Sequence, residues 1–160
     1  MPALGSYSDN AKATVKVEGL KTLQTALQEL PKATVQSVML RVLKKRAQPI
    51  AEAARQLVPV DSGKLRNSIV VSTKLTRRQR GQQEKAGPND VEVFVDPGSL
   101  PQAHLQEFGT FKEPPQPILR PAWDAEKENA LKGIAADMWA EIEKAAARLA
   151  KKAAKAAAKG

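Results

Sequence analysis

The sequence predicts an α+β fold, with a small antiparallel or mixed β-sheet packed against a long kinked helix and a long C-terminal helix. Three observations support this expectation. Apolar residues recur at helical spacing over residues 32–58, β-branched residues gather at 66–75 and 91–95, and the chain after Pro121 is rich in strong helix formers. The length of 160 residues suits one domain with one core, with room for an appendage.

The N-terminal part contains three predicted segments. Residues 1–13 are small and polar without periodicity, so we expect a flexible arm. Residues 14–17 alternate like a short strand. A helix follows from Gly19 to Pro31, with an apolar face made by Leu20, Leu23, Leu27 and Leu30. We divide the chain into this arm, an α+β domain at 14–143 and a basic Lys/Ala-rich tail at 144–160.

The longest helical pattern covers residues 32–58. Pro49 interrupts it, because proline lacks an N–H and its ring clashes with the preceding turn. We therefore expect either a kink near Arg46 or two abutting helices. Pro59 disfavours the helical region for Val58 and should end the segment there.

A turn and two strands are expected next. The side chain of Asp61 can bond the backbone two residues on, and Gly63 can adopt a positive φ. The strands at 66–75 and 91–95 are joined by the polar, basic segment 76–90, which predicts a long hairpin loop. Loops of this length are commonly functional or disordered.

The remaining chain contains a turn, a short segment, an extended connector and the last helix. Residues 96–99 are a turn signal, and residues 113–121 are predicted to be extended because their prolines fix φ. This connector is interpreted as a crossover from the sheet, with recognition by a proline-binding adaptor domain as the alternative. The last helix is predicted from Pro121 to about Ala158, with buried candidates Trp123, Leu131, Ile134, Met138, Ile142 and Leu149. Trp123 and Trp139 are interpreted as core or interface anchors.

The composition narrows the class of protein. With 4% aromatic residues, the core must consist mostly of Leu, Val, Ile and Ala, and we expect it to be thin. The lack of cysteine excludes a disulfide framework and thiolate metal sites. No apolar run approaches the roughly 18–20 residues of a membrane span, and the polar N-terminus lacks a secretory apolar segment. We therefore expect a soluble protein, not secreted, with no membrane partner.

The positive charge is concentrated in two places. The formal net charge of +9 is compatible with an anionic partner. The first basic cluster, at 74–85 in and just before the predicted loop, consists of Lys74, Arg77, Arg78, Arg80 and Lys85. The second, in the tail, consists of Lys144, Arg148, Lys151, Lys152, Lys155 and Lys159. The loop either contacts DNA phosphates or an acidic protein face, or is a solvated hairpin tip. The tail either neutralises DNA non-specifically, or is a solubilising tail or a continuation of the last helix across a neighbour.

An enzymatic site is not indicated. His104 is the single histidine, and Glu107 would share its face on a helical turn. No second histidine, cysteine or obvious third ligand accompanies them, so a local hydrogen bond or a subunit contact is the preferred interpretation. The sequence also contains no phosphate-binding glycine loop and no nucleophile elbow. We expect no catalytic residues, cofactor or metal, and a metal-dependent enzyme centred on this pair remains the less favoured alternative.

Four segments in order resemble a known family. They are VEGLKTL at 17–23, LVPVDSGKLRNSI at 57–69, AHLQEFGT at 103–110 and PQPILRPA at 115–122. Together they resemble the head–tail joining proteins of tailed bacteriophages, and in particular the neck or tail-completion proteins of lambdoid long-tailed phages related to minor tail protein Z. The resemblance covers residues 15–145. The residues that we interpret as fold-defining or subunit-contacting are Pro59, Asp61, Gly63, Leu65, His104, Glu107, Gly109, Pro117 and Arg120.

The resemblance implies a structural virion protein. Such a subunit would be assembled in the host cytoplasm into a ring at the head–tail interface, with a hexamer favoured and a dodecamer as the alternative. Its neighbours would be the phage connector and the tail-terminator or tail-tube proteins, and genomic DNA would pass non-specifically through the lumen. The contrasting hypothesis is a stand-alone, non-specific DNA-binding protein with a histone-like basic tail.

Overall fold

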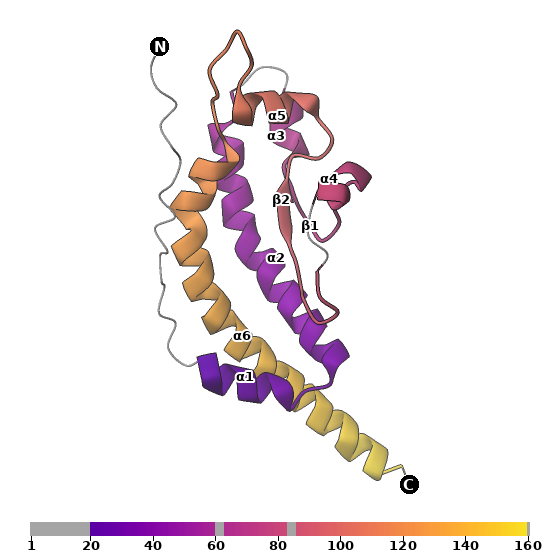
Figure 1. The fold of residues 1–160 in the computed structure, drawn as a ribbon. Coiled ribbons are helices and arrows are strands. Elements are labelled where there is room, and N and C mark those ends of the chain that lie inside the picture. Colours follow the sequence, from indigo (N-terminus) through magenta and orange to yellow (C-terminus); the bar gives the residue numbers. More distant parts are fainter. Residues whose placement is uncertain (1–19, 60–62, 83–85, 160) are drawn as a thin grey trace.

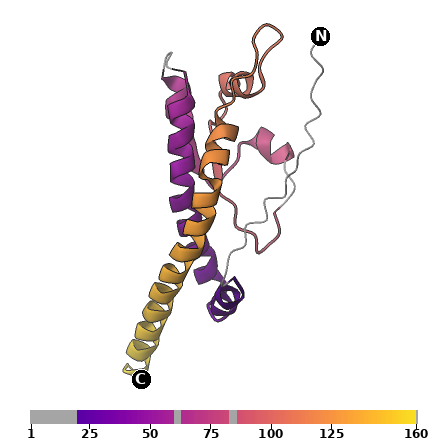
Figure 2. The ribbon, with the colours of Figure 1, turned by 90° about the vertical axis from the view of Figure 1, so that its left-hand side faces the viewer.

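Two long antiparallel helices form the frame of the protein in a computed structural model, which describes residues 20–59, 63–82 and 86–159. Helix α2 spans Lys32–Leu57 and helix α6 spans Leu119–Ala157, and they lie side by side in both ribbon views (Figures 1 and 2). Helix α1, Leu20–Gln28, crosses the frame near the start of α2 and packs on α6. The predicted strand at 14–17 and the arm at 1–13 lie outside the described residues.

The sheet is small and lies against α2 near the start of α6. Strand β1, Val70–Ser72, pairs antiparallel with β2, Phe94–Asp96, so that Val71 lies opposite Val95. Both strands contact α2. Two short helices, α3 at Lys64–Ser68 and α4 at Arg77–Gln82, flank β1, and α5 at Pro101–Phe108 follows β2. The α+β class with a small antiparallel sheet and a long C-terminal helix is thus confirmed.

Three local predictions were wrong. Residues 64–68 form helix α3, so the first strand is restricted to residues 70–72 instead of covering 66–75. The second strand is shifted from 91–95 to 94–96, because residues 91–93 run past α2 without strand pairing. The loop predicted at 76–90 contains helix α4.

Both long helices follow their sequence signals closely. Helix α2 continues through Pro49, so the alternative of two abutting helices is wrong, and it ends at Leu57 with Val58 extended in front of Pro59. Helix α6 begins two residues before Pro121 and ends one residue before Ala158. Of its positions predicted to be buried, Met138 and Ile142 are buried, Leu131, Ile134 and Leu149 are half-buried, and Trp123 is 54% exposed.

The core is divided into two clusters along the α2–α6 frame. The α1 cluster lies where α1 crosses the frame and consists of Leu23, Val38, Val42, Met138, Ile142 and Ala145. The sheet cluster lies at the other end and consists of Ala51, Ala54, Val58, Ile69, Ile118 and Ala122. Three of the six residues of the sheet cluster are alanines from α2 and α6, whose small side chains allow these helices to pack against each other. The buried members of both clusters are Leu, Val, Ile and Ala with one Met, which confirms the expected aliphatic composition of the core.

Candidate functional site

The carboxylate of Glu107 joins α5 to the start of α6. Its Oε2 accepts hydrogen bonds from the backbone N–H groups of Ile118 at 2.8 Å and Leu119 at 3.1 Å, and its Oε1 accepts one from Arg120 at 3.2 Å. The first N–H groups of a helix have no acceptor within the helix, and a negative charge at this end also interacts favourably with the helix dipole. Glu107 therefore acts as the N-terminal cap of α6 from a different element.

Gly109 makes the tight turn that brings Glu107 to this position. It combines φ 76° with ψ 179°, a conformation essentially confined to glycine. A Cβ at this position would lie 2.7 Å from the backbone N of Pro115 and 3.0 Å from the carbonyl O of Glu113. The glycine thus allows the connector to fold back on the end of α5, where the N–H of Gln116 also donates to the carbonyl of Gln106 at 2.9 Å.

His104 lies on α5 one turn before Glu107 but does not act with it. Its ring lies 4.8 Å from that of Phe108 and is exposed, whereas Glu107 is engaged by the α6 backbone. Within the described residues, no group of three or more histidine, cysteine or acidic side chains could hold a metal ion. Glu107 thus holds the start of α6, while His104 contacts Phe108 on its own helix.

The other predicted fold-defining residues surround the sheet cluster. Gly63 has φ 70° and precedes α3, and Leu65 on that helix is half-buried against the sheet cluster. Pro59 is exposed directly after the end of α2, and Pro117 is exposed before the buried Ile118. Arg120 contributes its backbone N–H to Glu107. Asp61 and Lys85 lie outside the described residues.

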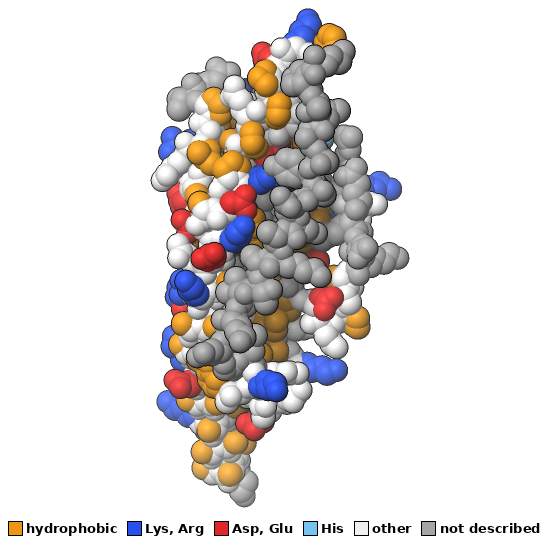
Figure 3. All heavy atoms as spheres, turned by 60° about the vertical axis from the view of Figure 1, so that its left-hand side comes forward, with side chains coloured by type: hydrophobic (Ala, Val, Ile, Leu, Met, Phe, Trp, Pro, Cys, Tyr) orange, Lys and Arg blue, Asp and Glu red, His pale blue; other side chains and the backbone are white. Residues whose placement is uncertain are grey.

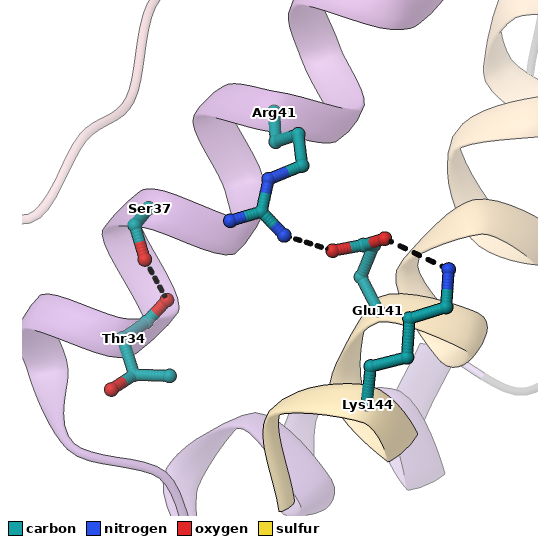
Figure 4. A network of polar contacts seen from close by, with 5 residues as sticks. All are labelled: Thr34, Ser37, Arg41, Glu141 and Lys144. Carbon is teal, nitrogen blue, oxygen red and sulfur yellow. Dashed lines mark hydrogen bonds and ion pairs between the residues drawn. The ribbon is translucent and has the colours of Figure 1, made fainter. Parts of the chain in front are cut away.

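Ion pairs and hydrogen bonds between charged side chains link α2 to α6. Glu141 on α6 accepts hydrogen bonds from Arg41 on α2 and, at 3.3 Å, from Lys144 on its own helix (Figure 4). On the α2 side, the hydroxyl of Ser37 donates to the carbonyl of Thr34 at 2.9 Å. Burial raises the pKa of Glu141, but its two cationic partners outweigh that effect, so the net pKa is lowered. Glu141 is therefore held ionised at the beginning of the basic segment of α6.

A second group of charged side chains lies one turn earlier on α6, nearer to the N-terminal end of that helix. Asp137 accepts from Arg46 Nε at 2.7 Å and lies 3.1 Å from Lys45 Nζ. The hydrogen bond from Arg46 is the largest cause that lowers the pKa of Asp137 to about 2. The Arg46 guanidinium reaches this carboxylate by lying directly over Gly133, in the space that a Cβ would occupy. A glycine inside a long helix is thereby explained by an arginine that crosses it.

The cations of the predicted tail form a stripe along the free end of α6. Helix α6 runs without interruption from the domain into this segment and projects beyond α1 (Figure 1). At about 100° per residue, five cations fall within an arc of about 100° on one side of the helix. This α6 stripe consists of Lys144, Arg148, Lys151, Lys152 and Lys155.

The rest of the helix surface beyond the α1 cluster is formed almost entirely by alanines. In Figure 3 the projecting end, at the bottom of the view, shows mainly hydrophobic side chains and backbone. Arg148, Lys151, Lys152 and Lys155 are exposed and form no ion pair with any residue that the structure describes. The stripe is therefore a one-sided cationic surface about 17 Å long, in which Lys144 alone is paired within the described structure.

The second basic cluster lies elsewhere. Lys74, Arg77 and Arg80 are exposed on and before α4, which projects from the sheet side of the protein, far from the free end of α6 (Figures 1 and 2). Lys159 follows the end of α6 and is exposed. The fold does not bring the two clusters together, so they form two separate anion-attracting surfaces. Of Arg78, only its backbone in α4 is described.

Two of these features could be detected from sequence to different extents. The one-sidedness of the α6 stripe follows from residue spacing once the segment is taken as helix. The cap formed by Glu107 could not be predicted from the sequence, because its three partners lie 11 to 13 positions away across a turn whose path depends on Gly109.

Comparison with known protein families places part of the chain in a family. A family model described as "Bacteriophage HK97-gp10, putative tail-component" matches residues 21–109, which is more than half of the chain. The match covers α1 to α5 and ends at Gly109. Comparison with curated proteins and with solved structures gave no match. Among the described residues, no helix is both long and apolar enough to cross a membrane.

Proposed function

The chain belongs to the HK97 gp10-like family of bacteriophage tail components, and on this premise we propose that it is a non-catalytic neck protein of the minor tail protein Z type. It would form a homo-oligomeric ring at the head–tail interface, completing the tail and joining the portal-connector side to the tail tube. Genomic DNA would pass through the lumen. The resemblance of segments 103–110 and 115–122 to head–tail joining proteins supports this finer assignment beside the family match.

The observation that carries the proposal is the α6 stripe. Five cations share one side of a helical extension, and four of them have no ion pair in the described structure. Cations presented in this way neutralise phosphates without reading sequence, because their contribution comes from counterion release. Non-specific attraction is what a channel that conducts an arbitrary genome requires. The stripe would thus face the DNA or an acidic rim of the adjacent ring.

Several features support assembly into a ring. The core is divided and rich in alanine, and large apolar side chains stay exposed on a single chain, among them Phe108, Phe111 and Trp123. Exposed apolar groups of this size commonly mark contacts with other proteins. A hexamer is the favoured ring and a dodecamer the alternative. The neighbours would be connector and tail-terminator or tail-tube proteins, which the cations around α4 could contact.

The test combines oligomer mass with DNA binding. Native mass spectrometry and electron microscopy of the purified protein should show a closed ring. DNA binding should fall with salt, and replacing Arg148, Lys151, Lys152 and Lys155 by glutamine should reduce the slope of log K against log salt by about 0.9 for each lost phosphate contact. Glutamine preserves helix propensity.

A matched control separates the stripe from total charge. Replacing the exposed Lys21, Lys32, Lys44 and Lys132 by glutamine removes the same charge from other surfaces. The control should keep most of the salt slope. Equal losses in both variants would reject the stripe as the DNA-facing surface, and a protein that stays monomeric would reject the ring. A monomer that binds duplex DNA tightly would instead support the stand-alone DNA-binding protein.

A further inference from the structure

A hydrophobic knob projects from the end of the protein at which α6 begins. The connector between α5 and α6 extends away from the body as a loop (Figures 1 and 2). Phe111 at its end is fully exposed, and Phe108 and Leu105 on α5 are 65% and 49% exposed. We define Leu105, Phe108 and Phe111 as the knob. A monomer gains nothing from exposing a large aromatic side chain in this way.

The loop that carries Phe111 is held by its own hydrogen bonds. The hydroxyl of Thr110 accepts from the N–H groups of Lys112 at 3.2 Å and Glu113 at 3.0 Å, and the N–H of Thr110 donates to the carbonyl of Glu113 at 2.9 Å. The turn at Gly109 fixes its base. Because the loop is ordered in advance, docking Phe111 costs little conformational entropy.

An apolar groove lies between the two core clusters. It opens between α2 and α6, with residues 91–94 as its third wall, and encloses about 550 Å³. Its apolar lining includes Leu43, Ile50, Phe94, Trp123, Leu131 and Ile134. The core is therefore interrupted where a further apolar group could complete it, and the volume is sufficient for a bulky aromatic side chain. We call this site the α2–α6 groove.

We propose that the knob of one subunit inserts into the α2–α6 groove of the next subunit in the ring. This inference rests on the proposed ring and names its interface. The charges beside the two surfaces do not oppose the contact. Lys112 and Glu113 follow Phe111 in the connector, and the groove lining carries two cations and two acids, Arg46, Lys127, Glu92 and Glu128. Knob and groove occupy different places on the chain, so the contact is head-to-tail, the type that closes into a ring when the rotation allows.

Cross-linking tests the contact directly, since the chain has no native cysteine. Protein carrying Phe111→Cys, mixed with protein carrying Leu131→Cys and treated with a short bis-maleimide, should give a cross-linked dimer. Phe111→Cys alone should give little, and so should its mixture with Val70→Cys, which replaces an exposed apolar residue on β1. The double variant Phe111→Cys/Leu131→Cys should give a ladder up to the size of the ring.

Two outcomes would overturn the proposal while leaving the ring intact. The first is a ring of unchanged mass in which the 111–131 pair does not cross-link. The second is an intrachain cross-link in the variant Val15→Cys/Leu131→Cys, which would mean that the chain's own N-terminal segment fills the groove. A protein that is monomeric at every concentration would reject the ring as well.

An assembly variant gives an independent measurement. Phe111→Ser should abolish the oligomer at concentrations where the wild type is assembled, without changing the far-ultraviolet circular dichroism or the unfolding midpoint of the monomer. Leu57→Ser, which replaces another exposed apolar residue outside both surfaces, should leave assembly unchanged. Normal assembly of Phe111→Ser would overturn the proposal.

Discussion

The carboxylate of Glu107 accepts a hydrogen bond from the backbone N–H of Ile118 at 2.8 Å, and this contact links the end of α5 to the buried residue that directly precedes α6. Replacing Glu107 by alanine leaves the first N–H groups of α6 without this acceptor. We expect a loss of about 0.5–2 kcal/mol in the free energy of unfolding, the usual range for a lost helix cap. Urea unfolding followed by circular dichroism measures it.

Two further substitutions separate the cap from a general effect of charge. Glu107→Gln keeps an acceptor oxygen but loses the charge, so its loss should be smaller than that of Glu107→Ala. Glu113→Ala removes an exposed carboxylate from the connector and should change the free energy of unfolding by less than about 0.5 kcal/mol. If Glu107→Ala were as stable as Glu113→Ala, the cap would contribute nothing.

Substitution of Gly109 by alanine should be the more damaging of two glycine changes. Gly109 and Gly98 have φ 76° and 72°, but only at Gly109 would a Cβ meet backbone atoms, whereas nothing lies within 4 Å at Gly98. Gly98→Ala should cost about 1–2 kcal/mol for the left-handed conformation. Gly109→Ala should cost more, because the clash with Pro115 is added. Thermal unfolding of both variants measures the two losses in stability. Equal losses would contradict the clash at Gly109.

The effect of Gly133→Ala should depend on Arg46. Alanine is favoured over glycine in a helix by about 1 kcal/mol, but a Cβ here would displace the guanidinium of Arg46 from Asp137. In an Arg46→Ala background, Gly133→Ala should therefore raise the free energy of unfolding by about 1 kcal/mol. In the wild-type background the gain should be absent or reversed. A double-mutant cycle measures the difference, and an equal gain in both backgrounds would contradict the contact.

The stability supplied by Asp137 should disappear in acid. Its pKa is about 2 in the folded protein, below the ordinary value of about 3.9 expected in the unfolded chain. A carboxyl group with a lowered pKa stabilises fully above the unfolded value and loses this contribution as the pH falls through the folded value. The Tm difference between wild type and Asp137→Asn should thus be constant from pH 7 to about 5 and shrink toward pH 2.

A control for this titration is Asp124, whose partner is Lys127 on the exposed side of the same helix at i,i+3 spacing. Such pairs contribute little, so Asp124→Asn should produce a small Tm difference at pH 7. A Tm difference for Asp137→Asn that does not change between pH 7 and 2 would show that the effect is not ionic.

Helix positions could be predicted from the sequence where the signals are local. Pro59 set the end of α2, and the positive φ of Gly63 followed from its place in a turn. The continuity of α2 through Pro49 was not decided by the sequence, because packing of α2 against α6 can support a helix that lacks one backbone hydrogen bond. Short helices α3 and α4 were missed, since five or six residues provide almost no periodicity.

The candidate surfaces were predictable to the extent that they depend on composition. The basic residues of the tail were recognised, but their alignment on one side required the continuous helix α6. Trp123 was predicted to be buried from helical spacing alone, which cannot show that the core is interrupted beside it. The knob and the α2–α6 groove combine segments distant in the chain, and no local pattern reveals them.

Because α6 is uninterrupted, the direction in which the stripe points is fixed relative to the body of the protein. Removing Ala146 alone would turn every later cation by about 100° around the helix axis relative to Glu141 and the body, with charge and composition almost unchanged. Inserting seven alanines after Ala146 in the otherwise unchanged chain would instead keep the direction to within about 20° while moving the cations about 10 Å along the axis. A protein that needs only its charge would tolerate the deletion, whereas a ring whose stripes must all face one axis would not.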